Sequence, residues 1–148
     1  MFERYSEHAR RAVFFARHLA NQSGSPTIET EHLLLGLVRE AGPLFPRLAP
    51  SVSIEDLRQR IPRKALCDAD TPAPIVMPLS MECKRILSYS AEESNDLNHA
   101  YICAEHLLLG ILRENSCFAA RLLAEAGVQL EAIRALLVET PAPHNSHL

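Results

Sequence analysis

The sequence predicts an all-α fold made of two similar halves. Apolar residues recur at helical spacing, and no segment shows the alternation of a strand. A ten-residue segment, Glu31 to Glu40, returns as Glu105 to Glu114, displaced by 74 positions. The two copies differ only at two neighbouring positions, where aliphatic residues replace one another. Because internal repetition of this kind determines an architecture, we expect eight helices in two sets of four.

The displacement also holds upstream of the repeated segment. Ser6 falls on Ser80 and Ile28 falls on Ile102 without a gap, and the register slips by two only near the end of the first half. One unit of about seventy residues is too small to bury much apolar surface alone. The two halves should therefore share one hydrophobic core.

Helix boundaries follow from capping residues and breakers. Ser6, Ser53, Ser80 and Ser116 are suitable N-caps, whereas Gly127 ends a helix. In the first half, the expected helices span 6–20, a segment beginning near Thr30, 43–48 and 53–61. In the second half, they span 80–96, 103–115, 116–127 and 128–139.

A glycine stands in the middle of the second helix of each half. Gly36 costs about 1 kcal/mol there relative to alanine, yet it recurs as Gly110. The recurrence predicts that another helix packs closely against the backbone at both positions.

Residues 1–139 are expected to form one domain. It divides into repeat one (1–61), a proline-containing connector (62–79) and repeat two (80–139). The remaining segment, 140–148, contains two prolines and polar residues and is expected to be a flexible tail.

Composition excludes several classes of protein. The formal charge of -3 argues against a nucleic-acid binder, and the apolar runs are too short to span a membrane. The N-terminus lacks the apolar core of a signal peptide, which predicts a cytoplasmic location. Without secretion, the cysteines should be reduced, with Cys83, Cys103 and Cys117 as small core residues on helices.

No catalytic motif is present. The sequence has no P-loop, and the pairs Glu31-His32 and Glu105-His106 lack the second histidine of a zinc-binding H-E-x-x-H. We expect each histidine to donate a ring hydrogen bond to a neighbouring group. A small metal-dependent hydrolase using the Glu-His pairs remains an alternative, but we predict no catalytic residue, no metal and no cofactor.

Two serine and glutamate pairs could bind a ligand. Ser6 and Ser80 each begin a helix, whose N-terminus favours a phosphate. Glu31 and Glu105 each lie 25 residues further on, in the first turn of the next helix. A carboxylate there suits a guanidinium through charge-assisted hydrogen bonds. Helix capping alone also explains all four residues.

The sequence resembles the N-terminal domain of the Clp ATPases, and most of all the ClpC type. The resemblance rests on Arg4 to Ala9, Thr30 to Glu40 and Ala104 to Glu114, and it covers about 1–139. It implies a pseudo-twofold bundle of eight helices made of two four-helix repeats. It also implies a role in receiving adaptor proteins and substrates for an ATP-driven unfoldase.

In some ClpC-type members, each repeat binds phosphoarginine. The resemblance places the guanidinium on Glu31 and Glu105 and the phosphate at Ser6 and Ser80. The family usually has Gly-Thr before Glu-His, where this sequence has Glu29-Thr30 and Cys103-Ala104. The added charge of Glu29 would repel a phosphate.

The sequence therefore predicts a non-enzymatic protein-interaction module of the Clp proteolytic system. Its expected partners are a Clp ATPase, adaptor or substrate proteins and phosphoarginine. The alternative within binding proteins is a helical peptide-binding protein unrelated to Clp.

Overall fold

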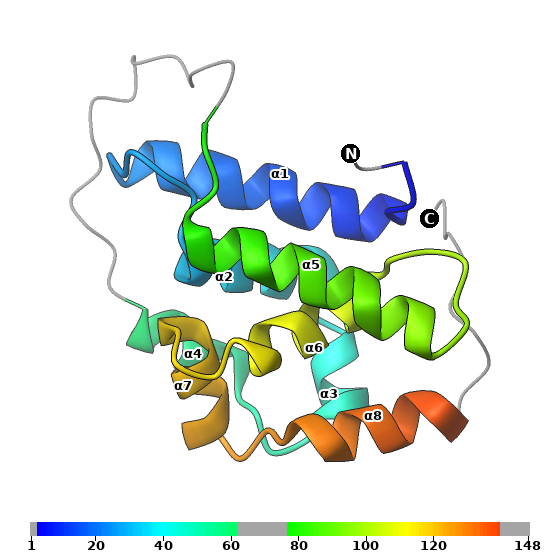
Figure 1. The fold of residues 1–148 in the computed structure, drawn as a ribbon. Coiled ribbons are helices and arrows are strands. Elements are labelled where there is room, and N and C mark those ends of the chain that lie inside the picture. The colour runs from blue at the N-terminus through cyan, green and yellow to red at the C-terminus, as the bar shows by residue number, and fades with distance from the viewer. Residues whose placement is uncertain (1–2, 62–76, 140–148) are drawn as a thin grey trace.

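The fold consists of two helical hairpins with shorter helices below them (Figure 1). A computed structural model describes residues 3–61 and 77–139. The first-repeat helices are α1 (Glu7–Gln22), α2 (Thr30–Ala41), α3 (Leu44–Leu48) and α4 (Ile54–Arg60). The second-repeat helices are α5 (Met81–Asp96), α6 (Ala104–Arg113), α7 (Phe118–Glu125) and α8 (Leu130–Glu139).

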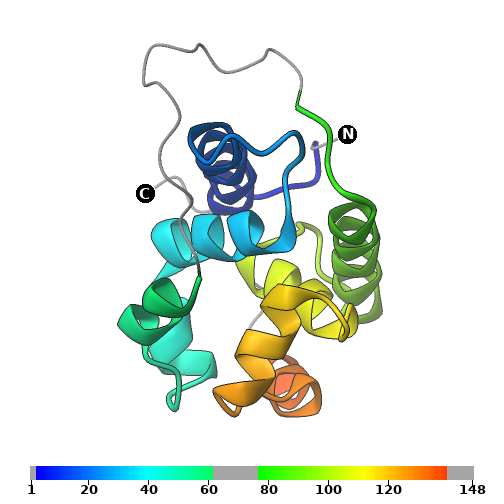
Figure 2. The ribbon, with the colours of Figure 1, turned by 90° about the vertical axis from the view of Figure 1, so that its left-hand side faces the viewer.

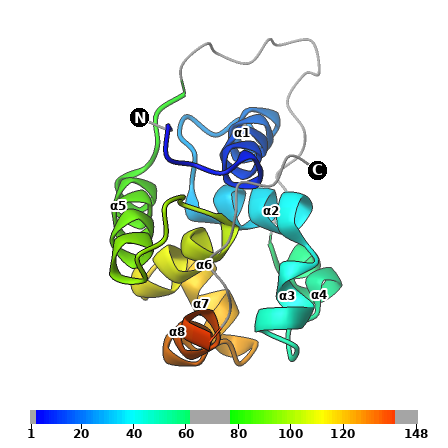
Figure 3. The same ribbon diagram turned by 90° about the vertical axis from the view of Figure 1, so that its right-hand side faces the viewer.

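The two repeats lie side by side around α2 and α6. Figures 2 and 3 show the first-repeat helices on one side and the second-repeat helices on the other. Residues 32–38 and 106–112 are buried on every face of their helices. A helix that is apolar all round belongs in the interior, so the repeated segment forms the shared core that the sequence predicts.

The repeats exchange contacts reciprocally. Short parallel bridges join Tyr5 to Ile102 and Ile28 to Leu79. The repeat displacement of 74 relates Tyr5 to Leu79 and Ile28 to Ile102, so each bridge is the counterpart of the other. Such exchange is the signature of an interface related by twofold symmetry, here between two halves of one chain.

Both mid-helix glycines lie at close helix crossings, as predicted. A Cβ atom on Gly36 would lie 2.2 Å from the backbone oxygen of Ala12 on α1. A Cβ atom on Gly110 would lie 2.6 Å from the backbone oxygen of Ile86 on α5. Neither position has room for a side chain, and this requirement explains why each helix accepts the cost of a glycine.

The predicted caps are confirmed at three helices and wrong at one. The hydroxyl oxygens of Ser6, Ser53 and Ser80 accept backbone N–H groups as expected. At α7 the cap is Cys117 rather than Ser116, and its sulfur accepts the N–H of Ala120.

The cysteine prediction is correct for burial and partly wrong for location. Cys83, Cys103 and Cys117 are buried free thiols, but only Cys83 lies within a helix, because the other two occupy N-cap positions. Burial raises the pKa of Cys83 to about 12 and that of Cys103 to about 11. Both thiols therefore stay protonated at neutral pH.

Two expectations lie on or beyond the limits of the described residues. Most of the connector 62–79 and the whole tail 140–148 fall outside them. Within 3–61 and 77–139, no helix combines the length and apolar character that a membrane span requires.

Candidate functional site

Each candidate serine is hydrogen-bonded to the segment that leads into the glutamate-bearing helix of the other repeat. The backbone N–H of Ser6 donates to Ile102 O at 3.0 Å, just before the start of α6 and Glu105. The N–H of Ser80 donates to Ile28 O at 3.0 Å, just before the start of α2 and Glu31. The two candidate sites are therefore composite, with one helix N-terminus from each repeat.

The pairing of residues 25 positions apart is not what the structure shows. Because α1 has 16 residues and rises about 1.5 Å per residue, its two ends are roughly 24 Å apart. The following helix, α2, runs back along it, so Ser6 and Glu31 lie at opposite ends of one hairpin (Figure 1). The same holds for Ser80 and Glu105 on α5 and α6.

In both sites the serine hydroxyl caps the N-terminus of its helix. Ser6 Oγ accepts the N–H of Ala9 at 3.2 Å, and Ser80 Oγ accepts the N–H of Cys83 at 3.1 Å. A bond from Ser6 also partly offsets the effect of burial on the pKa of Cys103. The backbone bond from Ser6 to Ile102 O ties the N-terminus of α1 to that of α6.

Two arginines lie near the start of α6 and Glu105. The Glu105 carboxylate, only 14% exposed, lies 3.4 Å from Arg47 Nη2. Arg4, which precedes the cap of α1, reaches Ala100 O with its Nε at 3.5 Å. The surroundings of the Glu105 carboxylate therefore include one bound guanidinium, that of Arg47, and a second arginine on the preceding segment.

The Glu31 site has a different character. Glu29 stands at the N-cap of α2, and its carboxylate accepts the hydroxyl of Thr27. Across from it, Met81 begins α5 and is 64% exposed. This site therefore offers two carboxylates and an apolar side chain where the other site offers arginines.

The two histidines of the repeated segment accept hydrogen bonds at the helix start. His32 Nδ1 accepts the N–H of Glu29 at 3.0 Å, and His106 Nδ1 accepts the N–H of Cys103 at 2.8 Å. The sequence predicts that each of these rings donates a hydrogen bond, and a donor can only be the opposite nitrogen, Nε2, because Nδ1 accepts one in both rings. Each ring also satisfies a backbone donor at the N-terminus of its helix.

His106 also pairs with a second histidine that has no counterpart in repeat one. Its Nε2 lies 2.8 Å from His99 Nδ1. Because Nδ1 of His106 accepts a backbone N–H, the proton of the neutral ring is on Nε2, which donates to His99. Burial lowers the pKa of His106 to about 4, and burial also lowers the pKa of His99. Both rings are therefore neutral at neutral pH.

This geometry disfavours a metal at His106, one of the two histidines that the hydrolase alternative needs. Both ring nitrogens of His106 are engaged in hydrogen bonds, so neither is available to a metal. No group of three or more metal-ligating side chains exists within the described part of the chain.

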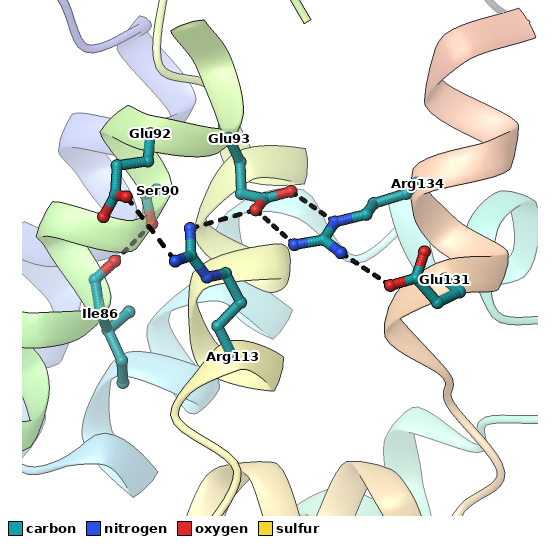
Figure 4. A network of polar contacts seen from close by, with 7 residues as sticks. All are labelled: Ile86, Ser90, Glu92, Glu93, Arg113, Glu131 and Arg134. Atoms are coloured by element: carbon teal, nitrogen blue, oxygen red, sulfur yellow. Dashed lines mark hydrogen bonds and ion pairs between the residues drawn. The ribbon is translucent and has the colours of Figure 1, made fainter. Parts of the chain in front are cut away.

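Sequence reasoning missed a buried charge network in repeat two (Figure 4). The Glu93 carboxylate on α5 is only 4% exposed. It accepts hydrogen bonds from Arg134 Nε at 2.9 Å and from Arg134 Nη2 at 2.7 Å. It also accepts a hydrogen bond from Arg113 Nη1 at 3.2 Å. The bonds from Arg134 lower the pKa of Glu93. The network joins α8 to α5 and α6, and its partners are too far apart in sequence to be paired by spacing.

The chain matches the family of Clp repeat N-terminal domains over residues 4–71 and 78–144. The chain belongs to this family. A ClpA homolog described as an ATP-binding subunit of ATP-dependent Clp protease, from Porphyra purpurea, is 34% identical over 141 residues. These cover 94% of this chain and 17% of that protein. The chloroplastic chaperone ClpC1 of Arabidopsis thaliana is 33% identical over 98% of this chain and 16% of its own length.

Solved Clp N-domains share the fold. The N-terminal domain of the chaperone ClpD from Arabidopsis thaliana superposes with a TM-score of 0.69 at 27% identity. That match covers 91% of this chain and 92% of the ClpD chain. The Hsp104 N-terminal domain from Candida albicans has a TM-score of 0.60 at 19% identity, with 93% and 91% covered. Membership removes the alternative of a helical protein unrelated to Clp.

Proposed function

We propose that this Clp N-terminal domain is a non-enzymatic protein-interaction module. It receives adaptor or substrate proteins for a Clp ATPase, and its two composite sites bind phosphoarginine. The chain spans only about a sixth of the length of the curated relatives it matches. The proposal therefore concerns the domain, and a cytoplasmic location remains a prediction beside relatives whose names include chloroplastic ones.

The crossed arrangement of helix N-termini carries the proposal. In phosphoarginine, the phosphoryl group is bonded directly to a guanidinium nitrogen, so an anion site and a carboxylate must adjoin. The N-terminus of α1 adjoins that of α6, and the N-terminus of α5 adjoins that of α2. Helix N-termini favour phosphate, and a carboxylate such as that of Glu105 or Glu31 accepts a guanidinium.

The charges around the two sites should affect how strongly each binds the phosphate of phosphoarginine. Arg4 beside Ser6 adds a cation that favours a phosphate, whereas Glu29 beside Glu31 adds a carboxylate that opposes one. The Thr27 hydroxyl donates to that carboxylate and so partly satisfies it. Both sites remain candidates, but their surroundings predict unequal affinities.

Calorimetric titration with phosphoarginine tests the ligand. We expect two sites in the wild-type domain, one site after Glu31→Ala or Glu105→Ala, and none after both changes. Glu92→Ala is the matched control, because this carboxylate is exposed and pairs with Arg113, which belongs to neither site. Arginine and inorganic phosphate, titrated separately, should bind more weakly because each engages only half of a site. The absence of heat at millimolar phosphoarginine would refute the assignment.

A pull-down from the source cell tests the partner class. The tagged domain should retain Clp ATPase, adaptor or protease subunits. Recovery of none of these, from an extract in which they are detected, would count against a Clp interaction module even if phosphoarginine binds.

A further inference from the structure

Arg47 places a guanidinium of the chain itself on one of the two candidate ligand carboxylates. It lies on α3 of repeat one, and its Nη2 is 3.4 Å from Glu105 Oε2 on α6 of repeat two. The Arg47 side chain is 50% exposed, whereas that of Glu105 is 14% exposed. The arginine therefore covers a carboxylate that has little other access to solvent.

The equivalent arginine of repeat two makes no such contact. Arg121 follows Arg47 by 74 positions and lies on α7, next to the start of α2, because Thr30 Oγ1 accepts the N–H of Ala119 at 3.3 Å. In the described residues, no ion pair joins Arg121 to Glu31. Arg121 instead lines a pocket of about 380 Å³ with Arg60, Phe118, Leu122 and Glu125.

The asymmetry affects ligands directly, because a ligand guanidinium and the Arg47 guanidinium have the same charge and donor geometry. Both seek the oxygens of one largely buried carboxylate. A ligand must therefore displace Arg47 before it gains the full interaction with Glu105. The Glu31 carboxylate imposes no such step, because no arginine is bound to it in the described structure.

We propose that Arg47 is an internal competitor that weakens guanidinium binding at the Ser6–Glu105 site alone. This inference rests on the function proposed above, since it concerns the guanidinium end of the same ligand. It makes Arg47 a specificity-determining residue for one site, and it makes the two repeats unequal in affinity although their recognition residues are repeated.

The test isolates each site before Arg47 is changed. In a Glu31→Ala background, only the Ser6–Glu105 site remains, and Arg47→Gln should tighten phosphoarginine binding roughly two- to fivefold. That range corresponds to the strength of an exposed ion pair. Arg121→Gln in the same background is the matched control and should leave the affinity unchanged. In a Glu105→Ala background, Arg47→Gln should have no effect on the Glu31 site.

The outcomes separate this inference from the proposed function. Binding that is unchanged or weakened by Arg47→Gln in the Glu31→Ala background overturns the competitor role, because a weakened affinity would make Arg47 a ligand contact. Binding that appears only after Arg47→Gln supports it most strongly. If phosphoarginine binds in neither background, with or without Arg47, the phosphoarginine assignment fails and this inference fails with it.

Discussion

The two repeats stabilise the same hairpin in different ways. Repeat one packs α1 on α2 with a row of small apolar residues, and Ala12 and Ala16 lie directly under Gly36. In repeat two, the corresponding residues under Gly110 are Ile86 and Ser90. The Ser90 hydroxyl donates to Ile86 O at 2.8 Å. Both hairpins are therefore closed by close contact with the glycine, but in repeat two the side chain at the crossing is polar and is satisfied by a hydrogen bond within α5.

The contrast extends along α5 to its polar residues. Glu93 occupies the position of Leu19, and Ser94 occupies that of Ala20. The Ser94 hydroxyl lies within hydrogen-bonding distance of His99 O at 3.1 Å and Tyr101 O at 2.9 Å. Since each polar group has a partner, repeat two buries them without the penalty of an unsatisfied group. The same backbone arrangement thus accepts either apolar or polar side chains at these two positions.

The first prediction removes the carboxylate at the centre of the buried charge network of repeat two. Glu93→Ala leaves Arg113 and Arg134 without their shared carboxylate, and it should lower the free energy of unfolding by about 3 kcal/mol. This is the low end for a broken buried pair, because both arginines are partly exposed. Urea denaturation measures the change. Glu92→Ala, which removes an exposed carboxylate, should cost about 0.5 kcal/mol or less. Equal effects of the two changes would show that the network adds no stability.

The second prediction compares the glycines. Gly36→Ala should cost about 2–3 kcal/mol, because the new methyl group meets backbone at 2.2 Å and the helices must separate. Gly110→Ala should cost less, about 1–2 kcal/mol. Its nearest obstacle, at 2.4 Å, is the Ser90 hydroxyl, which can rotate, and the backbone oxygen lies at 2.6 Å. Thermal unfolding of the two variants under identical conditions gives the order, and the reverse order would contradict this account of the packing.

Much of this architecture could be predicted from the sequence, because the signals are local or repeated. The displacement of 74 and the capping serines predict the helix pairs, and Gly36 and Gly110 predict the close crossings. Ser116 was the wrong cap because the adjacent Cys117 also carries an acceptor, and capping patterns do not distinguish neighbours. These inferences needed only residues close in sequence or an exact copy.

The candidate site required long-range information. The pairing of Ser6 with Glu31 could have been rejected from helix length alone, since a helix of 16 residues separates its ends by roughly 24 Å. The contact between Arg47 and Glu105 joins residues 58 apart, and no sequence pattern pairs them. Sequence therefore predicts which residue types are present in the sites, whereas the fold determines which of them meet.

The third prediction uses the histidine pair that only repeat two contains. His106 has a folded pKa of about 4 against 6.5 for the free side chain, so the unfolded chain binds more protons between these values. Stability is then complete above pH 6.5 and falls as the pH drops toward 4, by about 3 kcal/mol at most. His106→Gln should flatten this part of the profile of unfolding free energy against pH. An unchanged slope between pH 6.5 and 4.5 would place the acid sensitivity elsewhere.

The smallest predicted effect concerns a contact that repeat one makes to repeat two. Thr30, 2% exposed, accepts the N–H of Ala119 in the first turn of α7. Its counterpart Ala104 has no hydroxyl. At the corresponding position of repeat one, the N–H of Phe45 donates instead to the backbone oxygen of Gly42, the C-cap of α2, at 3.1 Å. Thr30→Val keeps the shape, removes the acceptor and should cost about 1 kcal/mol.

Hydrogen exchange can follow the two amides, those of Ala119 and Phe45, separately. In Thr30→Val, the amide of Ala119 should exchange faster, whereas the amide of Phe45 should keep its wild-type rate, because its acceptor lies within repeat one. Ser53→Ala provides a scale, since it removes an ordinary helix cap at α4 that contributes about 1 kcal/mol. If Ala119 stays protected in Thr30→Val, the thiol of Cys117 and the packing of α7 are sufficient to hold that helix. The asymmetry at this position would then be one of sequence without an energetic consequence.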